Sequence, residues 1–361
     1  MIPYENLLQS NKEFFKDYQR VFKETLDSGW YILGKQVTDF EGEYASYCGS
    51  EYCVGVANGL DALTICLRAL NLSKGDEVIV PSNTYIATIL AIVNNGLKPV
   101  LVEPNIATYN IEPTLIEEKI TSRTKAIMVV HLYGKTCDMD PINELASRYK
   151  LSVIEDCAQA HGAKYKNTVV GNLGDFGAHS FYPTKNLGAL ADAGAITCNS
   201  ADSMESFKAL RNYGSSKKYY NDVVGLNSRL DEIQAAFLSV KLKRLDAITT
   251  HKRNLAEIYL KELNDNFIKP VTNEDHFDVY HIFNIRHNRR DELKAYLFDN
   301  GIGSEIHYPV TPNKQKAMKG ILNDQATPIA QKIHQTTLSL PISYCHSEED
   351  VYKVIEVLDK F

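Results

Sequence analysis

Long apolar runs are missing from this chain of 361 residues. No stretch reaches the roughly 18 consecutive apolar residues that a membrane-spanning helix needs, so we expect no transmembrane segment and no membrane partner. The opening MIPYENLLQSNKEFF also lacks the basic start and apolar middle of a secretory signal peptide. The seven cysteines are scattered without a CxxC pair, which is not the pattern of a zinc site or a disulfide framework. We therefore expect a cytoplasmic protein with free thiols.

Excess positive charge is also missing. The net charge is −6 and the sequence contains no run of lysine and arginine, so we expect no nucleic-acid partner. Repeats and linkers rich in Gly, Ser or Pro are absent as well. What the chain does have is 44% hydrophobic content over 361 residues, enough for one large core and a smaller second one.

The region from residue 52 to residue 198 alternates between short apolar segments and amphipathic ones. We predict strands at Tyr52–Ala57, Glu77–Pro81, Pro99–Glu103, Ala126–His131, Leu151–Glu155 and Ala193–Thr197. We predict helices at Leu60–Leu70, Tyr85–Asn94, Pro113–Ile120 and Pro141–Tyr149. This alternation predicts an α/β fold whose central sheet is mostly parallel and covered on both faces.

The pattern changes after residue 202. We predict a helix at Ser203–Tyr213, a polar loop at Lys217–Asn227 and one long helical pattern from Arg229 to about Leu263. A strand at Tyr280–Arg286 and helices at Asp291–Asn300 and Glu348–Lys360 follow, around a stretch at Glu305–Pro309. We expect a large domain over residues 1–250, with a helical segment at its N-terminal end, and a smaller α+β domain over residues 251–361.

Two residues between positions 153 and 196 suggest the chemistry. Asp156 ends an apolar strand, and in open α/β sheets ligands collect at the carboxyl ends of the strands. Lys185 follows 29 positions later, in a turn flanked by proline and glycine. Pyridoxal phosphate chemistry needs these two groups: a lysine for the Schiff base and an acid that keeps the pyridine nitrogen protonated. Taken singly, a solvated lysine and a structural aspartate are the ordinary alternatives.

Other residues fit the same cofactor. Gly59 stands where a strand gives way to a helix, so unpaired backbone N–H groups there could bind a phosphate, with the Ser180 hydroxyl as a further donor. Tyr85 could stack on a flat ring, and Gln159 could bond near its phenolic oxygen. A plain helix cap at Gly59 and a core tyrosine at Tyr85 are the alternatives. His161 either supports Asp156 or packs in the core, and the sequence does not separate the two.

Several segments together resemble one family, the pyridoxal-phosphate-dependent aminotransferases of nucleotide-linked keto sugars known as the DegT/DnrJ/StrS group. They span most of the chain: NGLDAL, PSNTYIAT, VVHLYG, VIEDCAQAHGA, GDFGAHSFYPTKNLGALADAGAI, LRNYGSSKKYYNDVVGLNSRLDEIQAAFL and EIHYP. One departure is Asn58-Gly59-Leu60 where many members read Ser-Gly-Thr. A threonine hydroxyl that would bind phosphate is therefore absent.

The resemblance implies a type I aminotransferase fold, pyridoxal 5'-phosphate as cofactor and a homodimer with active sites shared between subunits. It implies Lys185 as the Schiff-base lysine and Asp156 as the partner of the pyridine nitrogen. The other implied cofactor contacts are Gly59, Leu60, Tyr85, Gln159, Ser180 and, from the neighbouring subunit, Asn227. The implied substrate contacts are Lys217, Tyr219 and Arg229 from the neighbouring subunit, together with His307 and Tyr308.

The segments NGLDAL and GLNSRLDEIQAAFL are most similar to the branch that aminates C-3 of dTDP-3-keto-6-deoxyhexoses. The resemblance therefore implies amino transfer to such a sugar, with L-glutamate as donor. A 4-keto nucleotide sugar is the main alternative substrate. Lys185 argues against the family's dehydratases, which have histidine at that position. Lys185 and Asp156 together argue against a non-catalytic regulator, and the missing GxGxxG argues against a nicotinamide oxidoreductase.

Overall fold

A seven-stranded sheet forms the centre of the computed structural model, which describes residues 1–322 and 325–361. Its order is β1-β9-β8-β5-β4-β2-β3. The strands are β1 (Tyr52–Val56), β2 (Glu77–Pro81), β3 (Lys98–Val102), β4 (Thr124–Val130), β5 (Ser152–Asp156), β8 (Phe176–Ser180) and β9 (Gly194–Cys198). Neighbours from β8 to β3 pair in parallel, whereas β9 is antiparallel to both β8 and β1. The predicted mostly parallel sheet is confirmed.

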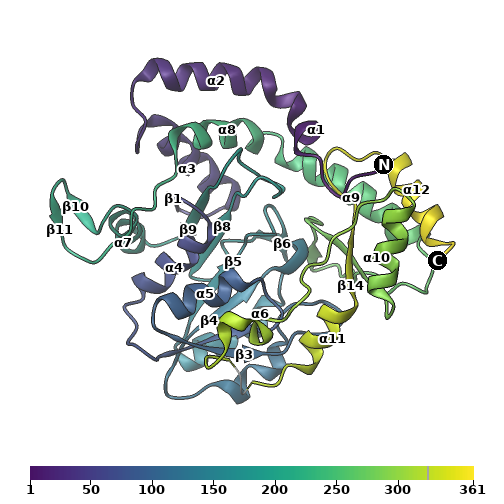
Figure 1. The fold of residues 1–361 in the computed structure, drawn as a ribbon. Helices are drawn as coiled ribbons and strands as arrows, with labels where there is room; N and C mark the ends of the chain where they lie inside the picture. The colour runs from purple at the N-terminus through teal and green to yellow at the C-terminus, as the bar shows by residue number, and fades with distance from the viewer. Residues whose placement is uncertain (323–324) are drawn as a thin grey trace.

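Both faces of this sheet are buried. In β2, Val78 and Val80 pack into one apolar core, and Ile79 between them packs into another on the opposite face. The first core includes side chains of α4 (Gly59–Ala69), α5 (Ile86–Asn94) and α7 (Ala201–Arg211). The second includes side chains of α6 (Met139–Tyr149). Figure 1 shows the resulting layers of helix, sheet and helix.

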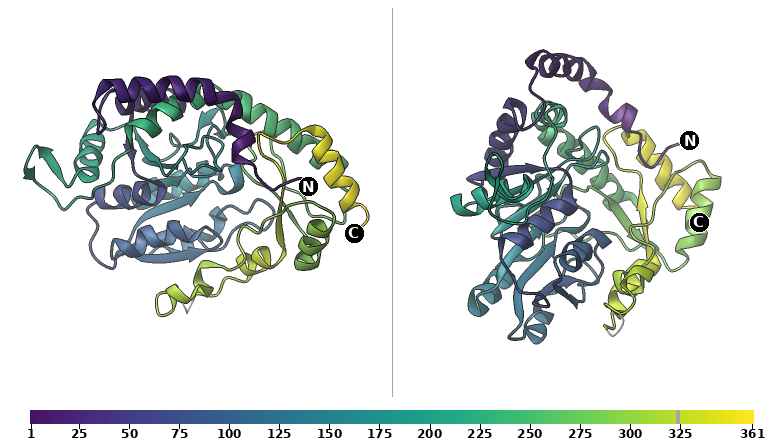
Figure 2. Two further views of the ribbon diagram at one scale, coloured as in Figure 1. Left: turned by 45° about the horizontal axis from the view of Figure 1, so that its top comes forward. Right: turned by 60° about the vertical axis from the view of Figure 1, so that its left-hand side comes forward.

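Helix α3 (Lys35–Cys48) packs against β1, and α8 (Glu232–Leu242) packs against α3. Helix α2 (Phe15–Ser28), which follows α1 (Leu7–Asn11), packs against α8. Side chains of α3 and α8 share a core with Phe181 and Leu187, on the chain that flanks Lys185. In Figure 1 and in the left view of Figure 2, α2 lies along one edge of the molecule over α8.

A separate apolar core, the C-terminal core, lies at the other end of the molecule. It includes side chains from α9 (Leu245–Glu262), β13 (Phe283–Arg286), α10 (Arg290–Asp299), β14 (Thr337–Leu340) and α12 (Glu348–Leu358). Strand β13 pairs with β14 in antiparallel fashion, and α11 (Pro328–Thr336) leads into β14. In α9, Leu245 belongs to the core beside α3 and Leu255 to the C-terminal core. That change of core inside α9 supports a domain boundary near residue 250, which stays a proposal.

Two small sheets complete the described chain. One has the order β12-β6-β7, formed by β12 (His276–Phe277), β6 (Lys164–Tyr165) and β7 (Thr168–Val169). The other is the hairpin of β10 (Ser215–Lys217) and β11 (Tyr220–Asn221), which projects from the body in Figure 1 and in the left view of Figure 2. Among the described residues, no helix combines the length and apolarity of a bilayer crossing.

Three local predictions are wrong. The long helix expected over 229–263 is two helices, α8 and α9, separated at Lys243–Arg244. The helix expected at Pro113–Ile120 is two 3₁₀ turns, Pro113–Leu115 and Glu117–Lys119. The loop expected at Lys217–Asn227 contains part of the β10–β11 hairpin.

Strand β8 was not predicted, because its sequence Phe-Gly-Ala-His-Ser is interrupted by glycine and polar residues. The fold accommodates both kinds of residue. A Cβ on Gly177 would lie 2.3 Å from the Cα atom of Gly171, so these two backbone segments approach too closely for any side chain there. The buried His179 ring bonds through Nδ1 to the Tyr44 hydroxyl at 2.9 Å and through Nε2 to the Thr197 hydroxyl at 3.0 Å.

Candidate active site

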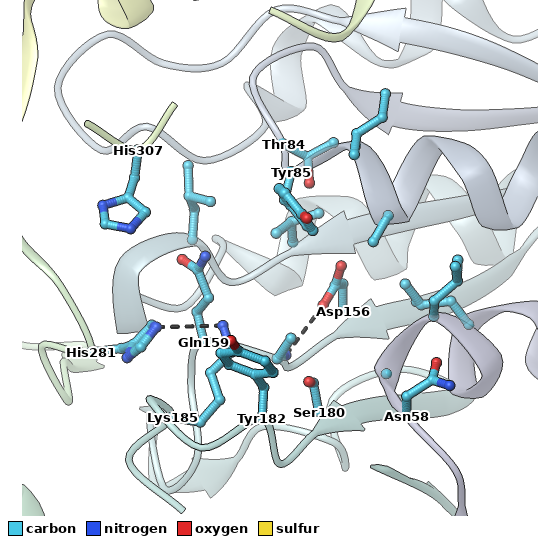
Figure 3. Close-up of a pocket in the computed structure, with 18 of the residues that line it drawn as sticks. Asn58, Thr84, Tyr85, Asp156, Gln159, Ser180, Tyr182, Lys185, His281 and His307 are labelled. Carbon is cyan, nitrogen blue, oxygen red and sulfur yellow. Dashed lines mark hydrogen bonds between the residues drawn. The ribbon is translucent and has the colours of Figure 1, made fainter. Parts of the chain in front are cut away.

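A cavity of about 540 Å³ lies at the carboxyl ends of β1, β2, β5 and β8. It is lined by Asn58, Gly59, Leu60, Thr84, Tyr85, Asp156, Gln159, Ser180, Tyr182, Lys185, His281, His307 and Tyr308, among others. Parallel strands bring their carboxyl ends to one edge, which is why residues far apart in sequence meet there. In Figure 3, His281 and His307 lie at one end of the cavity and Ser180 and Asn58 at the other.

Asp156 ends β5 and presents a carboxylate at the inner wall of this cavity. Its side chain is 7% exposed. Oδ2 accepts a hydrogen bond of 2.8 Å from the Thr88 hydroxyl, and Oδ1 accepts one of 3.1 Å from the Ala158 N–H. Burial raises the pKa of the Asp156 carboxyl, while these two bonds and the charge of Lys185 oppose the rise. The carboxylate is thus held in one orientation, with lone pairs left to accept from a cationic ligand.

Lys185 lies on the loop after β8 and directs its amine into the same cavity (Figure 3). Burial lowers the pKa of this amine to about 8, although the Asp156 carboxylate acts in the opposite direction. A substantial fraction of the amine is therefore neutral near physiological pH, which is the state a nucleophile or proton acceptor requires.

The first turn of α4 and the tip of β8 form a cradle of hydrogen-bond donors. The Asn58 side chain caps the helix by accepting a 2.9 Å bond from the Asp61 N–H. The N–H groups of Gly59 and Leu60 have no partner among the residues that the structure describes. A Cβ on Gly59 would lie 2.5 Å from Cβ of Ser180, so only glycine lets the turn pack against that serine. Free N–H groups at a helix N-terminus are suited to bind a phosphate.

Aromatic and amide side chains shape the opposite part of the cavity. Tyr85 lies with its ring 5.1 Å from that of Tyr308 and is 53% exposed. Gln159 is engaged at both ends: Oε1 accepts from the Tyr133 N–H at 2.7 Å, and Nε2 donates to the Tyr308 hydroxyl at 2.8 Å. The amide of Gln159 therefore holds Tyr308 in place besides lining the cavity.

His307 bonds through Nδ1 to the Ser339 hydroxyl at 2.9 Å. Burial, followed by the positive charge of Lys185, lowers its pKa to about 4, so the ring is neutral at pH 7. His161 makes no hydrogen bond to Asp156. Its ring packs 5.4 Å from that of Phe181, and neither ring nitrogen has a hydrogen-bond partner in the described chain, which favours the packing interpretation.

Four of the expected residues do not line the cavity of their own chain: Lys217, Tyr219, Asn227 and Arg229. Lys217 and Tyr219 lie on the projecting hairpin, and the Tyr219 side chain is 86% exposed. Arg229 donates a 3.1 Å bond to Oδ1 of Asn212 and lies 5.6 Å from the Tyr213 ring. The resemblance assigns these residues to the neighbouring subunit's site, so that assignment stays a prediction.

Sequence reasoning missed Thr88, Tyr182 and His281. Thr88 has a local signal, since it lies one helical turn after Tyr85 in the segment that follows β2. Tyr182 lies three residues before Lys185 in the same turn. His281 has no such signal: it is 96 positions from Lys185, yet its Nε2 lies 3.4 Å from the lysine Nζ. Only the packing of the C-terminal core against the large domain brings the two residues together.

Comparison with known proteins agrees with this geometry. A sequence model described as the DegT/DnrJ/EryC1/StrS aminotransferase family matches residues 13–359. The chain belongs to this aminotransferase family. A similar member is a protein of Aneurinibacillus thermoaerophilus named dTDP-3-amino-3,6-dideoxy-alpha-D-galactopyranose transaminase. The two are 54% identical over 362 residues, covering 100% of this chain and 99% of that one.

Solved structures share the fold of this chain. DesV of Streptomyces venezuelae, solved in complex with a ketimine intermediate, superposes with a TM-score of 0.97 at 41% identity, covering 99% of this chain and 98% of that one. NtdA of Bacillus subtilis, solved with bound cofactor PMP, gives a TM-score of 0.91 at 29% identity, covering 99% of this chain and 85% of that one. The predicted family, fold class and aminotransferase activity are confirmed.

The cavity of this family member fits a phosphorylated pyridine aldehyde. The cradle at Gly59 and Ser180 would be filled by a Cβ on the glycine, and its donors match a phosphate. The buried Asp156 carboxylate matches a protonated ring nitrogen, and the Lys185 amine matches an aldehyde carbon. The cavity therefore contains the three groups that this cofactor needs: donors for its phosphate, an acceptor for its ring nitrogen and a nucleophile for its aldehyde.

Proposed function

We propose that this chain uses pyridoxal 5'-phosphate to transfer an amino group from L-glutamate to C-3 of a dTDP-linked 3-keto-6-deoxyhexose. One observation carries the proposal: Lys185 and Asp156 line the same cavity, and the lysine pKa is lowered to about 8 by burial. A lysine that served only to stabilise the fold would not need to line a cavity of about 540 Å³, which is the size of a ligand site.

The cofactor, when bound, supplies an aldehyde for Lys185 and an electron-withdrawing ring that makes a neighbouring C–H bond acidic. The Gly59 and Leu60 N–H groups and the Ser180 hydroxyl would hold its phosphate. Asp156 would hold the proton on its ring nitrogen, with Thr88 and Ala158 keeping that carboxylate oriented.

Lys185 moves the proton in this account. Its free amine takes a proton from Cα of glutamate, and the same amine later delivers a proton to the sugar carbon that gains nitrogen. A pKa of about 8 suits both directions, because the amine exists in neutral and charged forms near pH 7. Tyr85, Gln159, His307 and Tyr308 bound the space around the reacting carbon and limit the access of water.

The choice of sugar rests on relatives. The Aneurinibacillus protein, 54% identical over the full length, is named for a dTDP-3-amino sugar. DesV, at 41% identity, supports the shared fold of the site. A 4-keto nucleotide sugar is the alternative substrate, because no single cavity residue distinguishes a ketone at C-3 from a ketone at C-4.

We also propose a homodimer with shared active sites. An isolated two-stranded hairpin is marginally stable in water, yet β10–β11 projects from the body. The chain around it exposes Tyr219, Tyr220 and Val224, with Val224 87% exposed. A second subunit that covered this hairpin would receive Lys217, Tyr219, Asn227 and Arg229 at its own site. A cytoplasmic location is part of the proposal, supported by the seven free cysteines of the described chain.

The substrate assignment is tested by incubating the protein with glutamate and a panel of 3-keto and 4-keto nucleotide sugars carrying dTDP, UDP or GDP. NMR then identifies the aminated carbon. We expect amination at C-3 of the dTDP sugar. Amination at C-4 alone would overturn the substrate proposal in favour of the 4-keto alternative, and transfer to no sugar in the panel would overturn sugar amination altogether.

The shared site is tested by mixing two inactive variants. In heterodimers of Lys185→Ala and Asn227→Ala subunits, one of the two sites combines an intact lysine with an intact asparagine. We expect activity above that of either variant alone. If co-purified heterodimers recover none, each subunit completes its own site and the proposal of shared sites is wrong.

A further inference from the structure

His281 is the one polar partner of the Lys185 amine within the described chain. Its Nε2 lies 3.4 Å from Nζ, and Figure 3 shows the contact at the end of the cavity. An ammonium group offers only hydrogens, so Nε2 accepts and the hydrogen of the neutral ring is on Nδ1. The contact joins the loop after β8 to the segment that enters β13, two parts of the chain that belong to different cores.

A buried polar network fixes this segment relative to Lys185. Asn186, the residue after the lysine, donates through Nδ2 to the Val279 carbonyl at 3.0 Å. The buried Lys252 of α9 donates to Oδ1 of the same asparagine at 2.8 Å and to the His281 carbonyl at 3.1 Å. The backbone of His281 is thus tied to the backbone beside Lys185 through the side chains of Asn186 and Lys252.

His281 is a neutral acceptor. Burial, followed by the positive charges of Lys185 and Lys252 and then by His307 and His161, lowers its pKa well below the usual range. The ionisable groups that face the histidine–lysine pair are Asp156, His161, Lys252 and His307. Only Asp156 among them is acidic, and it acts on Lys185 in the direction opposite to burial. The ring therefore stays uncharged across the pH range in which Lys185 titrates.

We propose that His281 is a positioning residue that holds the Lys185 amine in one place whenever the amine carries no covalent link. The inference rests on the proposed role of Lys185. A lysine tail has many rotamers, and a fixed acceptor at its tip selects one of them. The amine is then presented at the same place before each attack on the cofactor aldehyde. In that step Nζ forms a bond to the aldehyde carbon, and the aldehyde oxygen leaves as water with the two hydrogens of the amine.

The test follows this link in the full-length protein after its cofactor has been removed. Pyridoxal phosphate is added in a stopped-flow instrument, and the visible absorption of the lysine-bound cofactor is recorded from pH 6 to pH 10. In His281→Phe we expect the link to form about tenfold more slowly at every pH, because an unpositioned amine attacks less often. We expect the slower rate to persist above pH 8, where a slower rate caused only by a raised Lys185 pKa would disappear.

Three variants make the result specific. His281→Gln offers an amide oxygen at similar reach and is expected to restore most of the rate. His281→Asn is one methylene shorter and is expected to stay slow. His287→Phe is the matched control: this half-buried histidine bonds through Nδ1 to the Arg289 N–H and contacts Phe267 and Phe361, away from the cavity. We expect it to behave as the wild type.

A wild-type rate in His281→Phe across the pH range would overturn the inference. If that variant does not fold, as judged by thermal unfolding, the glutamine and asparagine pair decides: equal rates in the two would overturn the inference as well. Failure of the proposed function gives a different result, because then the wild type forms no visible band or Lys185→Ala keeps it.

Discussion

Replacing Asp156 with asparagine should lower the pKa of Lys185. Two effects set that pKa at about 8: burial lowers it, and the negative charge of Asp156 raises it. Asp156→Asn keeps the size of the side chain and removes the charge. Burial then lowers the pKa of Lys185 without an opposing negative charge, so that pKa must fall further below 8.

The size of the effect follows from the fraction of neutral amine. A lysine with its ordinary pKa has about one neutral amine in 3,000 at pH 7, whereas a pKa of 8 gives about one in ten, a gain of roughly 300-fold. The rate at which full-length protein captures pyridoxal phosphate should therefore rise with pH and reach half its maximum near pH 8. In Asp156→Asn the midpoint should fall at lower pH.

Capture and turnover should separate in this variant. Asp156→Asn keeps Lys185 and the phosphate donors, so it should still take up the cofactor. It should transaminate very poorly, because an amide does not keep the ring nitrogen protonated. Asp192→Asn is the control, since Asp192 lines the same cavity and is not among the groups that shift the Lys185 pKa. A midpoint near pH 10 in the wild type, an upward shift in Asp156→Asn, or near-normal turnover would refute the reasoning.

Three further substitutions test the site and its support. Gly59→Ala places a methyl group 2.5 Å from Cβ of Ser180, so the affinity for pyridoxal phosphate, measured by equilibrium titration, should fall at least about tenfold while Gly42→Ala, with open space around it, changes nothing. Glu155→Gln should lower the free energy of unfolding in urea by about 2–4 kcal/mol, because the buried carboxylate accepts from His131 and from the N–H groups of Gly171, Leu173 and Gly174. These bonds hold the pKa of Glu155 below its usual value against the effect of burial. The stability that they contribute is therefore present above the pKa of Glu155 in the unfolded state and is lost as the pH falls through its pKa in the folded state. A Glu155→Gln variant with unchanged acid sensitivity would contradict this. Tyr308→Phe removes the acceptor of the Gln159 amide and should raise KM for the sugar about tenfold with little change in cofactor affinity; an unchanged KM would show that the hydroxyl does not act on the sugar.

The central sheet could be predicted because its strands are apolar on both faces. The segments 78–81 and 126–130, for example, are continuous apolar runs, and amphipathic helices separate such segments. Asp156 could be assigned a place for the same reason, since it ends one of these strands. Lys185 follows β8, which was not predicted, so its role was assigned from its turn and from the family resemblance.

Predictions failed where tertiary contacts override local pattern. The turn at Lys243–Arg244 contains no proline or glycine, so nothing local marks the break between α8 and α9. Strand β8 depends on Gly177, which allows the backbone of Gly171 to approach closely. It also depends on His179, whose ring bonds to the hydroxyls of Tyr44 and Thr197. His281 reaches the site through a network of Asn186 and Lys252 that no short window of sequence contains.

The central claim is that the amine of Lys185 binds the cofactor. The most direct measurement is to treat the protein, loaded with pyridoxal phosphate, with borohydride, digest it and locate the modified lysine by mass spectrometry. We predict that the added mass is on the peptide carrying Lys185 and disappears in Lys185→Ala. Modification of another buried lysine, such as Lys241 or Lys252, with Lys185 unmodified would contradict the account.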